Sequence, residues 1–320
     1  MASKQSLANK AHYEMMAGVF AKGPVAPETL LELGETEWSA LTAEPRGVDY
    51  IEGDAAGTPV MWVIPKDSAN DRVILYAHGG GFVSGSIYTH RKMVGHLAKA
   101  AKCKALLFDY PYAHEHKHPK QLDVTVGVYR WALGQGLKPQ HLAIGGDSCG
   151  AVLSIGLMQR IRAERLPMPA AVMLISGWFD LTVSAPSFET NRDKDALFSK
   201  FSVEMLAANY LGGKTDPRDP YASPLHANLA GLPPMYLQAG GDETLVDESR
   251  MFADKARAAG VEVSLDVFPE MLHSFQMMAG RAPEADDAIA RLAKWVRPRL
   301  GLSASREAAS LLAIEQRIAS

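Results

Sequence analysis

The segment 145–150, Gly-Gly-Asp-Ser-Cys-Gly, lies between a strand-like run and a helix-like run and constrains the fold more than any other feature. The apolar residues 141–144 precede it, and the apolar run 151–158 is long enough to begin a buried helix. Gly146 and Gly150 remove Cβ atoms where the chain bends sharply and where a helix packs close to a strand. Ser148 is therefore predicted at the top of a strand–turn–helix connection with its hydroxyl exposed. The alternative is an ordinary turn with an incidental serine.

Strand-like and helix-like runs alternate along most of the chain. Strands are predicted near residues 60–64, 73–77, 105–108, 141–144, 171–175, 235–238 and 261–268, and helices near 91–101, 121–133, 151–163, 247–259 and 284–300. This alternation predicts an α/β fold in which helices cover both faces of a mostly parallel sheet. Ligands of such sheets bind beyond the carboxyl ends of the strands.

Two regions do not follow the alternation. Residues 1–45 are predicted to be helical, with Leu7, Ala11, Met15 and Val19 at helical spacing, and a segment of about 180–215 has no clear strand. We interpret them as an N-terminal helical cap segment, 1–45, and a cap insertion above the main α/β domain, 46–300, which is followed by a C-terminal tail, 301–320. Aromatic and Met side chains in and near the cap predict an apolar pocket, with these candidates: Phe82, Trp178, Phe179 and Met205.

Composition narrows the class of protein. The chain has 320 residues, 47% hydrophobic and 22% charged, as in ordinary globular proteins. A net charge of −3 gives no electrostatic reason to expect nucleic acid or an anionic membrane surface as a partner. With two cysteines, no apolar leader at the N-terminus and no apolar run that could span a membrane, a cytoplasmic protein is expected.

Three further motifs suit acyl transfer to Ser148. Residues 78–82, His-Gly-Gly-Gly-Phe, follow a predicted strand, and consecutive glycines can point backbone N–H groups at a developing oxyanion. A phosphate-binding loop is the competing interpretation, but its motif spacing is absent. His273 follows the last predicted strand and can serve as a general base, while Asp242 and Glu243 at the preceding strand end offer a carboxylate to orient it. The chain order serine, acid, histidine is that of α/β-hydrolases.

These residues carry a family resemblance. The His78-Gly79-Gly80-Gly81 box and the Gly146-Asp147-Ser148-Cys149-Gly150 motif resemble the signatures of the bacterial hormone-sensitive-lipase-like carboxylesterases. The resemblance implies an α/β-hydrolase fold with a mostly parallel eight-stranded sheet, an ester-hydrolysing activity without a cofactor, and a homodimer formed through the last strand. Residues 241–249 and 273–276 are most similar to the branch labelled monoterpene ε-lactone hydrolase-like.

The resemblance also implies roles for individual residues. It assigns the oxyanion hole to the backbone N–H groups of Gly80, Gly81 and Cys149, the last in place of the usual alanine. An ungapped alignment with the family motif makes Glu243 the catalytic acid, whereas a one-residue slip would select Asp242. The predicted triad is therefore Ser148, Glu243 and His273.

Histidines at positions 114, 116 and 118 raise the question of a metal site. No His-Glu-x-x-His pattern accompanies them, and the family's arginine is missing from this segment. We expect a solvated loop with one structural histidine and no metal.

The substrate is left open by the sequence. Short to medium acyl esters of apolar small molecules are the first expectation, and a lactone, opened by the same triad, is the alternative. A catalytically silent small-molecule binding protein on the same scaffold is a further alternative, although all three triad residues are present.

Overall fold

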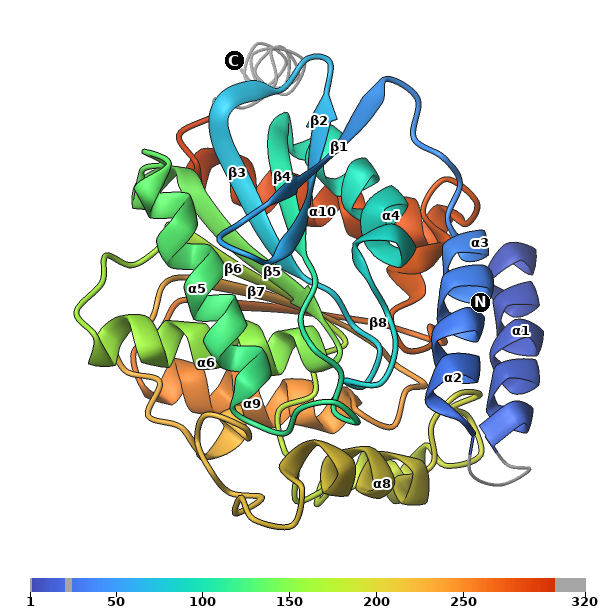
Figure 1. Ribbon diagram of the computed structural model, residues 1–320. Coiled ribbons are helices and arrows are strands. Elements are labelled where there is room, and N and C mark those ends of the chain that lie inside the picture. The colour runs from blue at the N-terminus through green and yellow to red at the C-terminus, as the bar shows by residue number, and fades with distance from the viewer. Residues whose placement is uncertain (1, 21–24, 303–320) are drawn as a thin grey trace, which may run out of the picture.

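The structure, a computed structural model, describes residues 2–20 and 25–302 (Figure 1). The predicted tail falls almost wholly outside the described residues. One eight-stranded sheet runs through the molecule in the order β1-β2-β4-β3-β5-β6-β7-β8. The strands are β1 (Val48–Asp54), β2 (Pro59–Pro65), β3 (Ala69–Ala77), β4 (Cys103–Phe108), β5 (Leu142–Asp147), β6 (Ala171–Ile175), β7 (Met235–Gly240) and β8 (Val263–Phe268).

Strand β2 is antiparallel to both β1 and β4. The other six strands, β3 to β8, are parallel to one another. The seven strands predicted from apolar runs are present. The eighth, β1, gives no such run because most of its side chains are exposed at the sheet edge. The predicted α/β fold is thus confirmed, with a mostly parallel sheet.

Helices cover both faces of the sheet (Figure 1). α4 and α10 pack together on one face, and α5, α6 and α9 lie on the other. The main helices are α1 (Lys4–Phe20), α2 (Pro27–Leu33), α4 (Ile87–Ala101), α5 (Lys120–Gly134), α6 (Cys149–Ala163), α8 (Lys200–Leu211), α9 (Val246–Ala258) and α10 (Pro283–Arg299). Shorter turns are η1 (Gly34–Trp38), α3 (Ser39–Leu41), η2 (Pro139–His141), α7 (Ser187–Thr190), η3 (Pro224–His226) and η4 (Phe275–Met278).

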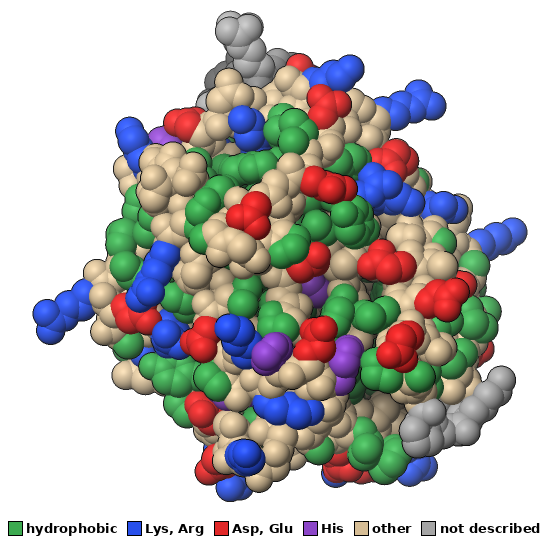
Figure 2. All heavy atoms as spheres, viewed as in Figure 1, with side chains coloured by type: hydrophobic (Ala, Val, Ile, Leu, Met, Phe, Trp, Pro, Cys, Tyr) green, Lys and Arg blue, Asp and Glu red, His purple; other side chains and the backbone are tan. Residues whose placement is uncertain are grey.

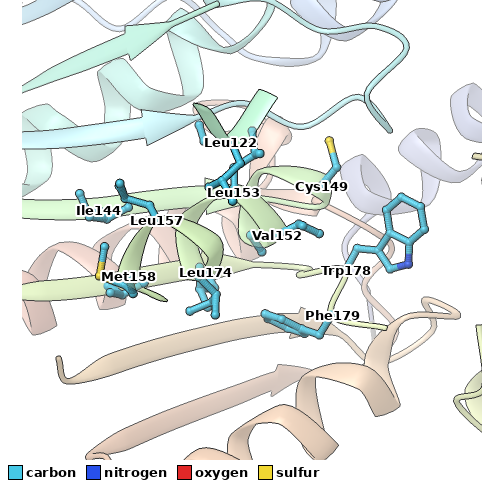
Figure 3. Packing of buried hydrophobic residues seen from close by; sticks show 14 of the residues in the cluster. Leu122, Ile144, Cys149, Val152, Leu153, Leu157, Met158, Leu174, Trp178 and Phe179 are labelled. Atoms are coloured by element: carbon cyan, nitrogen blue, oxygen red, sulfur yellow. The ribbon is translucent and has the colours of Figure 1, made fainter. Parts of the chain in front are cut away.

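The sheet separates two hydrophobic cores because successive side chains of a strand point to opposite faces. In β5, Ile144 packs with α6 and α5, whereas its neighbour Ala143 belongs to the core under α4 and α10. Figure 3 shows Ile144 beside Leu157 and Met158 of α6. The central strands are buried on both faces and are therefore continuous apolar runs in the sequence. This is why they could be predicted from the sequence.

Helix α1 confirms the helical prediction for the N-terminal segment but not its buried face. Leu7 and Met15 are largely exposed, whereas Tyr13 and Met16 are buried. The spacing of the aliphatic residues did not indicate the buried side of α1, because that side is centred on Tyr13. A tyrosine can be buried when its hydroxyl forms a hydrogen bond.

On the face that Figure 2 shows, acidic and basic side chains are interspersed, so neither sign of charge dominates that surface. None of the helices within the described ranges has the length and apolar character needed to cross a bilayer.

Candidate active site

Ser148 occupies the tight connection between β5 and α6. Its backbone angles, φ 53° and ψ −122°, lie in a region that non-glycine residues rarely adopt. Two glycines permit the bend: a Cβ on Gly146 would lie 2.5 Å from the Gly150 carbonyl oxygen, and a Cβ on Gly150 would lie 2.1 Å from the carbonyl oxygen of Ala77. The Ser148 amide donates to the Ile175 carbonyl (2.9 Å), which fixes the turn to β6.

A buried hydrogen bond joins the imidazole of His273 to the carboxylate of Glu243. The distance between His273 Nδ1 and Glu243 Oε2 is 2.9 Å, and both side chains are almost completely buried. Because a carboxylate only accepts, Nδ1 carries the proton and Nε2 is left as the basic atom. The structure brings Glu243 to His273, whereas the neighbouring Asp242 is half-buried and contributes its backbone amide to Met271 (3.0 Å).

The environment of His273 tunes its basicity. Burial alone would lower the pKa of this imidazole, but the hydrogen bond and the negative charge of Glu243 outweigh burial, so the pKa is raised above its usual value. Asp195 and Asp147 add smaller contributions in the same direction.

Close packing places the histidine loop beside the serine turn. Gly240, at the end of β7, lets the loop approach, since a Cβ there would lie 2.4 Å from the Met271 carbonyl oxygen. The Ser274 amide donates to Ser176 Oγ (2.9 Å), just beyond the end of β6. The Ser274 hydroxyl lies 3.5 Å from Asp147 Oδ2. The neighbours of His273 and of Ser148 are therefore in contact.

The glycine loop after β3 is anchored to the same turn. The Gly79 amide donates to Asp147 Oδ1 (3.0 Å), and a Cβ on Gly79 would lie 2.2 Å from Asp147 Oδ2. Gly80 (φ 116°) and Gly81 (φ 62°) then adopt angles that favour glycine. The glycine loop is thus anchored to the residue that precedes Ser148.

Two opposing influences act on the pKa of the buried Asp147 carboxyl. Burial raises the pKa of its carboxyl, but the nearby imidazoles, chiefly His90 at 3.3 Å, outweigh this and lower it. Tyr76 donates a hydrogen bond to the same carboxylate (3.1 Å). Burial lowers the pKa of His78 to about 3, so its ring is neutral, and Nδ1 binds the Gly79 carbonyl at 2.7 Å.

The chain resembles known proteins in both sequence and fold. Residues 74–277 match the family described as the α/β hydrolase fold. An esterase of Acinetobacter venetianus is 37% identical over 232 residues, covering 72% of this chain and 77% of the relative. An acetyl-hydrolase of Streptomyces hygroscopicus is 33% identical, covering 86% of this chain and 97% of the relative. A crystal structure of an esterase from the bacterial hormone-sensitive lipase family is similar with a TM-score of 0.89 and 37% identity, covering 94% of this chain and 99% of that chain.

This chain belongs to the α/β-hydrolase family. Within it, the chain is a carboxylesterase-type hydrolase similar to the bacterial hormone-sensitive-lipase group, which confirms the resemblance seen in the motifs. The lactone hydrolase-like branch stays a prediction.

Cys149 directly follows the serine of the hydrolase, but its thiol is not an activated nucleophile. Burial raises its pKa to about 12, although the hydrogen bond from Tyr110 opposes the shift. Its sulfur lies 3.6 Å from the Tyr110 hydroxyl. Both cysteines, Cys103 and Cys149, are buried and free.

The predicted pocket residues of the hydrolase lie in different surroundings. Phe82 is buried and stacked on Tyr210 with ring centroids 3.8 Å apart. Trp178 and Phe179 both belong to the buried core cluster (Figure 3), and Phe179 stacks on Phe252 with ring centroids 4.2 Å apart. Phe82, Trp178 and Phe179 are therefore all packed in the core, and their assignment to the pocket stays a prediction. The Met205 side chain is 56% exposed.

The three loop histidines do not converge. His114 and His116 are exposed, and His118 shares a hydrogen bond with the Tyr210 hydroxyl (2.9 Å). Within the described ranges, no cluster of three His, Cys, Asp or Glu side chains is arranged to hold a metal ion.

Three residues that no sequence pattern marked contact the backbone of the Glu243 and His273 loops. They come from α1 and from the 180–215 segment: Tyr13, Asn191 and Asp195. No motif or periodicity marks them, since their partners are distant in the sequence.

Proposed function

We propose that this hydrolase cleaves short to medium acyl esters of apolar small molecules through an acyl-enzyme on Ser148. The observation that carries the proposal is the buried 2.9 Å pair of His273 and Glu243, whose loop contacts the strained turn of Ser148. An ordinary turn with an incidental serine has no need of either feature.

In the first step, His273 Nε2 removes the Ser148 hydroxyl proton while Oγ attacks the ester carbonyl carbon. Glu243 holds the imidazole in the productive tautomer and stabilises the imidazolium. The backbone N–H groups of Gly80, Gly81 and Cys149 stabilise the charge that develops on the carbonyl oxygen. When the tetrahedral intermediate collapses, the imidazolium protonates the leaving alcohol.

In the second step, water attacks the acyl-enzyme. His273 takes a proton from the water, the same oxyanion hole receives the negative charge, and collapse returns the proton to Ser148 Oγ. The products are a carboxylic acid and the free enzyme, so the cycle needs no cofactor.

We further propose that the N-terminal helices and the 180–215 segment cover the site as a cap. Three side chains support this: Phe198 lies edge-on to the His273 ring with centroids 4.9 Å apart, Leu206 would lie 3.0 Å from a Cβ on Gly81, and Tyr13 reaches the His273 carbonyl. Ser148 is only 6% exposed beneath them. An apolar and confined surrounding favours small acyl groups.

Hydrolysis rates for p-nitrophenyl esters from acetate to palmitate, with a panel of lactones beside them, test this substrate class. We expect kcat/KM to be greatest for short or medium chains and to fall steeply for palmitate. A lactone preferred over every aryl ester would replace the proposed substrate class with the lactone alternative.

The role of Ser148 is tested by Ser148→Ala with labelling by a fluorophosphonate. The variant should lose nearly all turnover and labelling while its circular dichroism and unfolding temperature stay close to those of the unsubstituted protein. Turnover retained by a folded Ser148→Ala protein would refute the mechanism, and absence of labelling in the unsubstituted protein would favour a silent binding protein.

A further inference from the structure

We propose that the cap positions the catalytic acid and base of this hydrolase through Asn191, Asp195 and Tyr13, in addition to covering the substrate. The inference rests on the proposed triad. Asn191 and Asp195 lie in the 180–215 segment and contact the loop that carries Glu243, whereas Tyr13 lies on α1 and contacts the residue His273 itself.

Asn191 ties the cap to both sides of the acid. Its Nδ2 donates to the Gly241 carbonyl (3.0 Å) and to the carbonyl of Glu243 (2.9 Å), and the Asn191 side chain is buried. Both donor positions of the amide are therefore used on the backbone of one short loop. Because these carbonyls accept from a buried donor, removing the amide leaves polar groups without a partner in the interior.

Asp195 binds the same loop one residue later. Its Oδ2 accepts from the Thr244 amide (2.7 Å) and from the hydroxyl of the same threonine (2.9 Å). Its Oδ1 accepts from the amides of Leu197 and Phe198, at 2.8 and 3.0 Å. The carboxylate thus connects the acid loop to Phe198, whose ring meets His273. Hydrogen bonds to a charged acceptor are among the stronger ones in proteins.

Tyr13, on the N-terminal helix α1, holds the backbone of His273. Its hydroxyl donates to the carbonyl of His273 (2.8 Å), and the side chain is fully buried against Trp38, with ring centroids 5.4 Å apart. The contact spans 260 residues of sequence. The N-terminal helix therefore reaches the backbone of the catalytic histidine.

These contacts matter because the carboxylate of Glu243 has little else to orient it. Its Oε2 binds His273, while Oε1 has no hydrogen-bond partner among the described residues. The direction of the side chain then depends on the backbone of residues 241–244, which Asn191 and Asp195 hold. A displacement of about 1 Å in a catalytic group can lower the rate on the order of a hundredfold.

Two matched pairs of variants test the inference. Asn191→Ala removes the two donors to the acid loop, and Asn209→Ala removes an asparagine of α8 whose side chain binds only the exposed Lys117 among the contacts seen here. Tyr13→Phe removes the bond to His273, and Tyr129→Phe removes an equally short bond to a backbone carbonyl, that of Pro167 (2.7 Å), far from the site on α5.

The assay is hydrolysis of p-nitrophenyl acetate, whose small acyl group needs little of the pocket. We expect Asn191→Ala and Tyr13→Phe to lower kcat at least about tenfold with KM changed less than about threefold. The two control variants should keep kcat within about twofold. Tyr13→Phe preserves the buried ring, so it keeps the test decisive if Asn191→Ala does not fold.

The pH dependence of kcat/KM separates positioning from loss of stability. The charged groups that face His273 are Glu243, Asp195 and Asp147, and all of them raise its pKa against the effect of burial. A loosened Glu243 should let burial dominate, so the acidic limb of both test variants should move to lower pH. If a variant only lowered the stability of the fold, the molecules that remain folded would keep the acidic limb of kcat/KM at the same pH.

The outcomes distinguish the two proposals. If folded Asn191→Ala and Tyr13→Phe match their controls in kcat and in the acidic limb, or raise KM alone, the positioning role is refuted while the triad stands. If Ser148→Ala keeps its turnover, the proposed mechanism itself fails, and the positioning role fails with it.

Discussion

At the scale of single residues, the adjacent carboxylates of Asp242 and Glu243 lie in different surroundings. Glu243 is fully buried and bonded to His273, whereas Asp242 is half-buried and does not reach that ring. Neighbouring residues at the end of a strand point in different directions, so only one of them can face the base. This geometry favours Glu243 as the acid in the proposed triad.

Glu243→Gln should lower kcat on the order of a thousandfold or more, because the amide neither stabilises the imidazolium nor selects the tautomer. Its pH profile should change as well. The His273 pKa is raised only by its charged neighbours, against burial, so removing the largest of them lowers it. The neutral base then persists to lower pH, and the acidic limb of kcat/KM moves downward.

Asp242→Asn is the matched control for that measurement and should leave both kcat and the acidic limb nearly unchanged. The assignment of the acid would be reversed if Asp242→Asn lost activity while Glu243→Gln retained it.

At the scale of elements, the serine turn depends on helix α6 lying unusually close to strand β3. A Cβ on Gly150 would lie 2.1 Å from the Ala77 carbonyl oxygen and 2.9 Å from that of His78, and backbone atoms cannot move aside as side chains do. Helix α5 offers the opposite case, since a Cβ on its exposed Gly127 would meet nothing within 4 Å.

Gly150→Ala should therefore destabilise the fold by about 2 kcal/mol or more and abolish most activity by shifting the oxyanion loop. Gly127→Ala should raise the free energy of unfolding by about 0.5–1 kcal/mol, because alanine is the better helix former. Urea unfolding of the two variants measures both effects. Equal stability of the two variants would contradict this account of the turn.

At the scale of the whole molecule, the sheet ends at β1 on one side and β8 on the other. Among the described residues, strand β8 pairs only with β7, and five of its six residues are half-buried. An edge strand presents unpaired backbone groups that can pair with a second copy across a twofold axis. The homodimer implied by the family resemblance remains a prediction.

Sedimentation velocity at micromolar concentration should give a species of twice the 34.6 kDa chain mass. Replacing a half-buried β8 residue by lysine, as in Ser264→Lys, should shift that species toward the monomer. A single species at the chain mass in the unsubstituted protein would contradict the dimer.

The sequence was sufficient wherever the determinant is local. The central strands are buried on both faces and read as apolar runs, and the glycines around Ser148 mark a turn that few other residues permit. Strand β1 was not predicted because an exposed edge strand has no apolar run. The buried face of α1 was not predicted because a tyrosine, Tyr13, lies at its centre in place of an aliphatic residue.

By itself, the sequence determined the α/β alternation, the serine turn, the glycine loop and the order of the candidate triad, because each depends on residues close together in the chain. The tertiary structure decided which carboxylate meets His273, that Phe179 belongs to the core, and that Tyr13, Asn191 and Asp195 hold the acid and base loops. Those contacts join residues that are distant in sequence, and only the packing of the folded chain selects them.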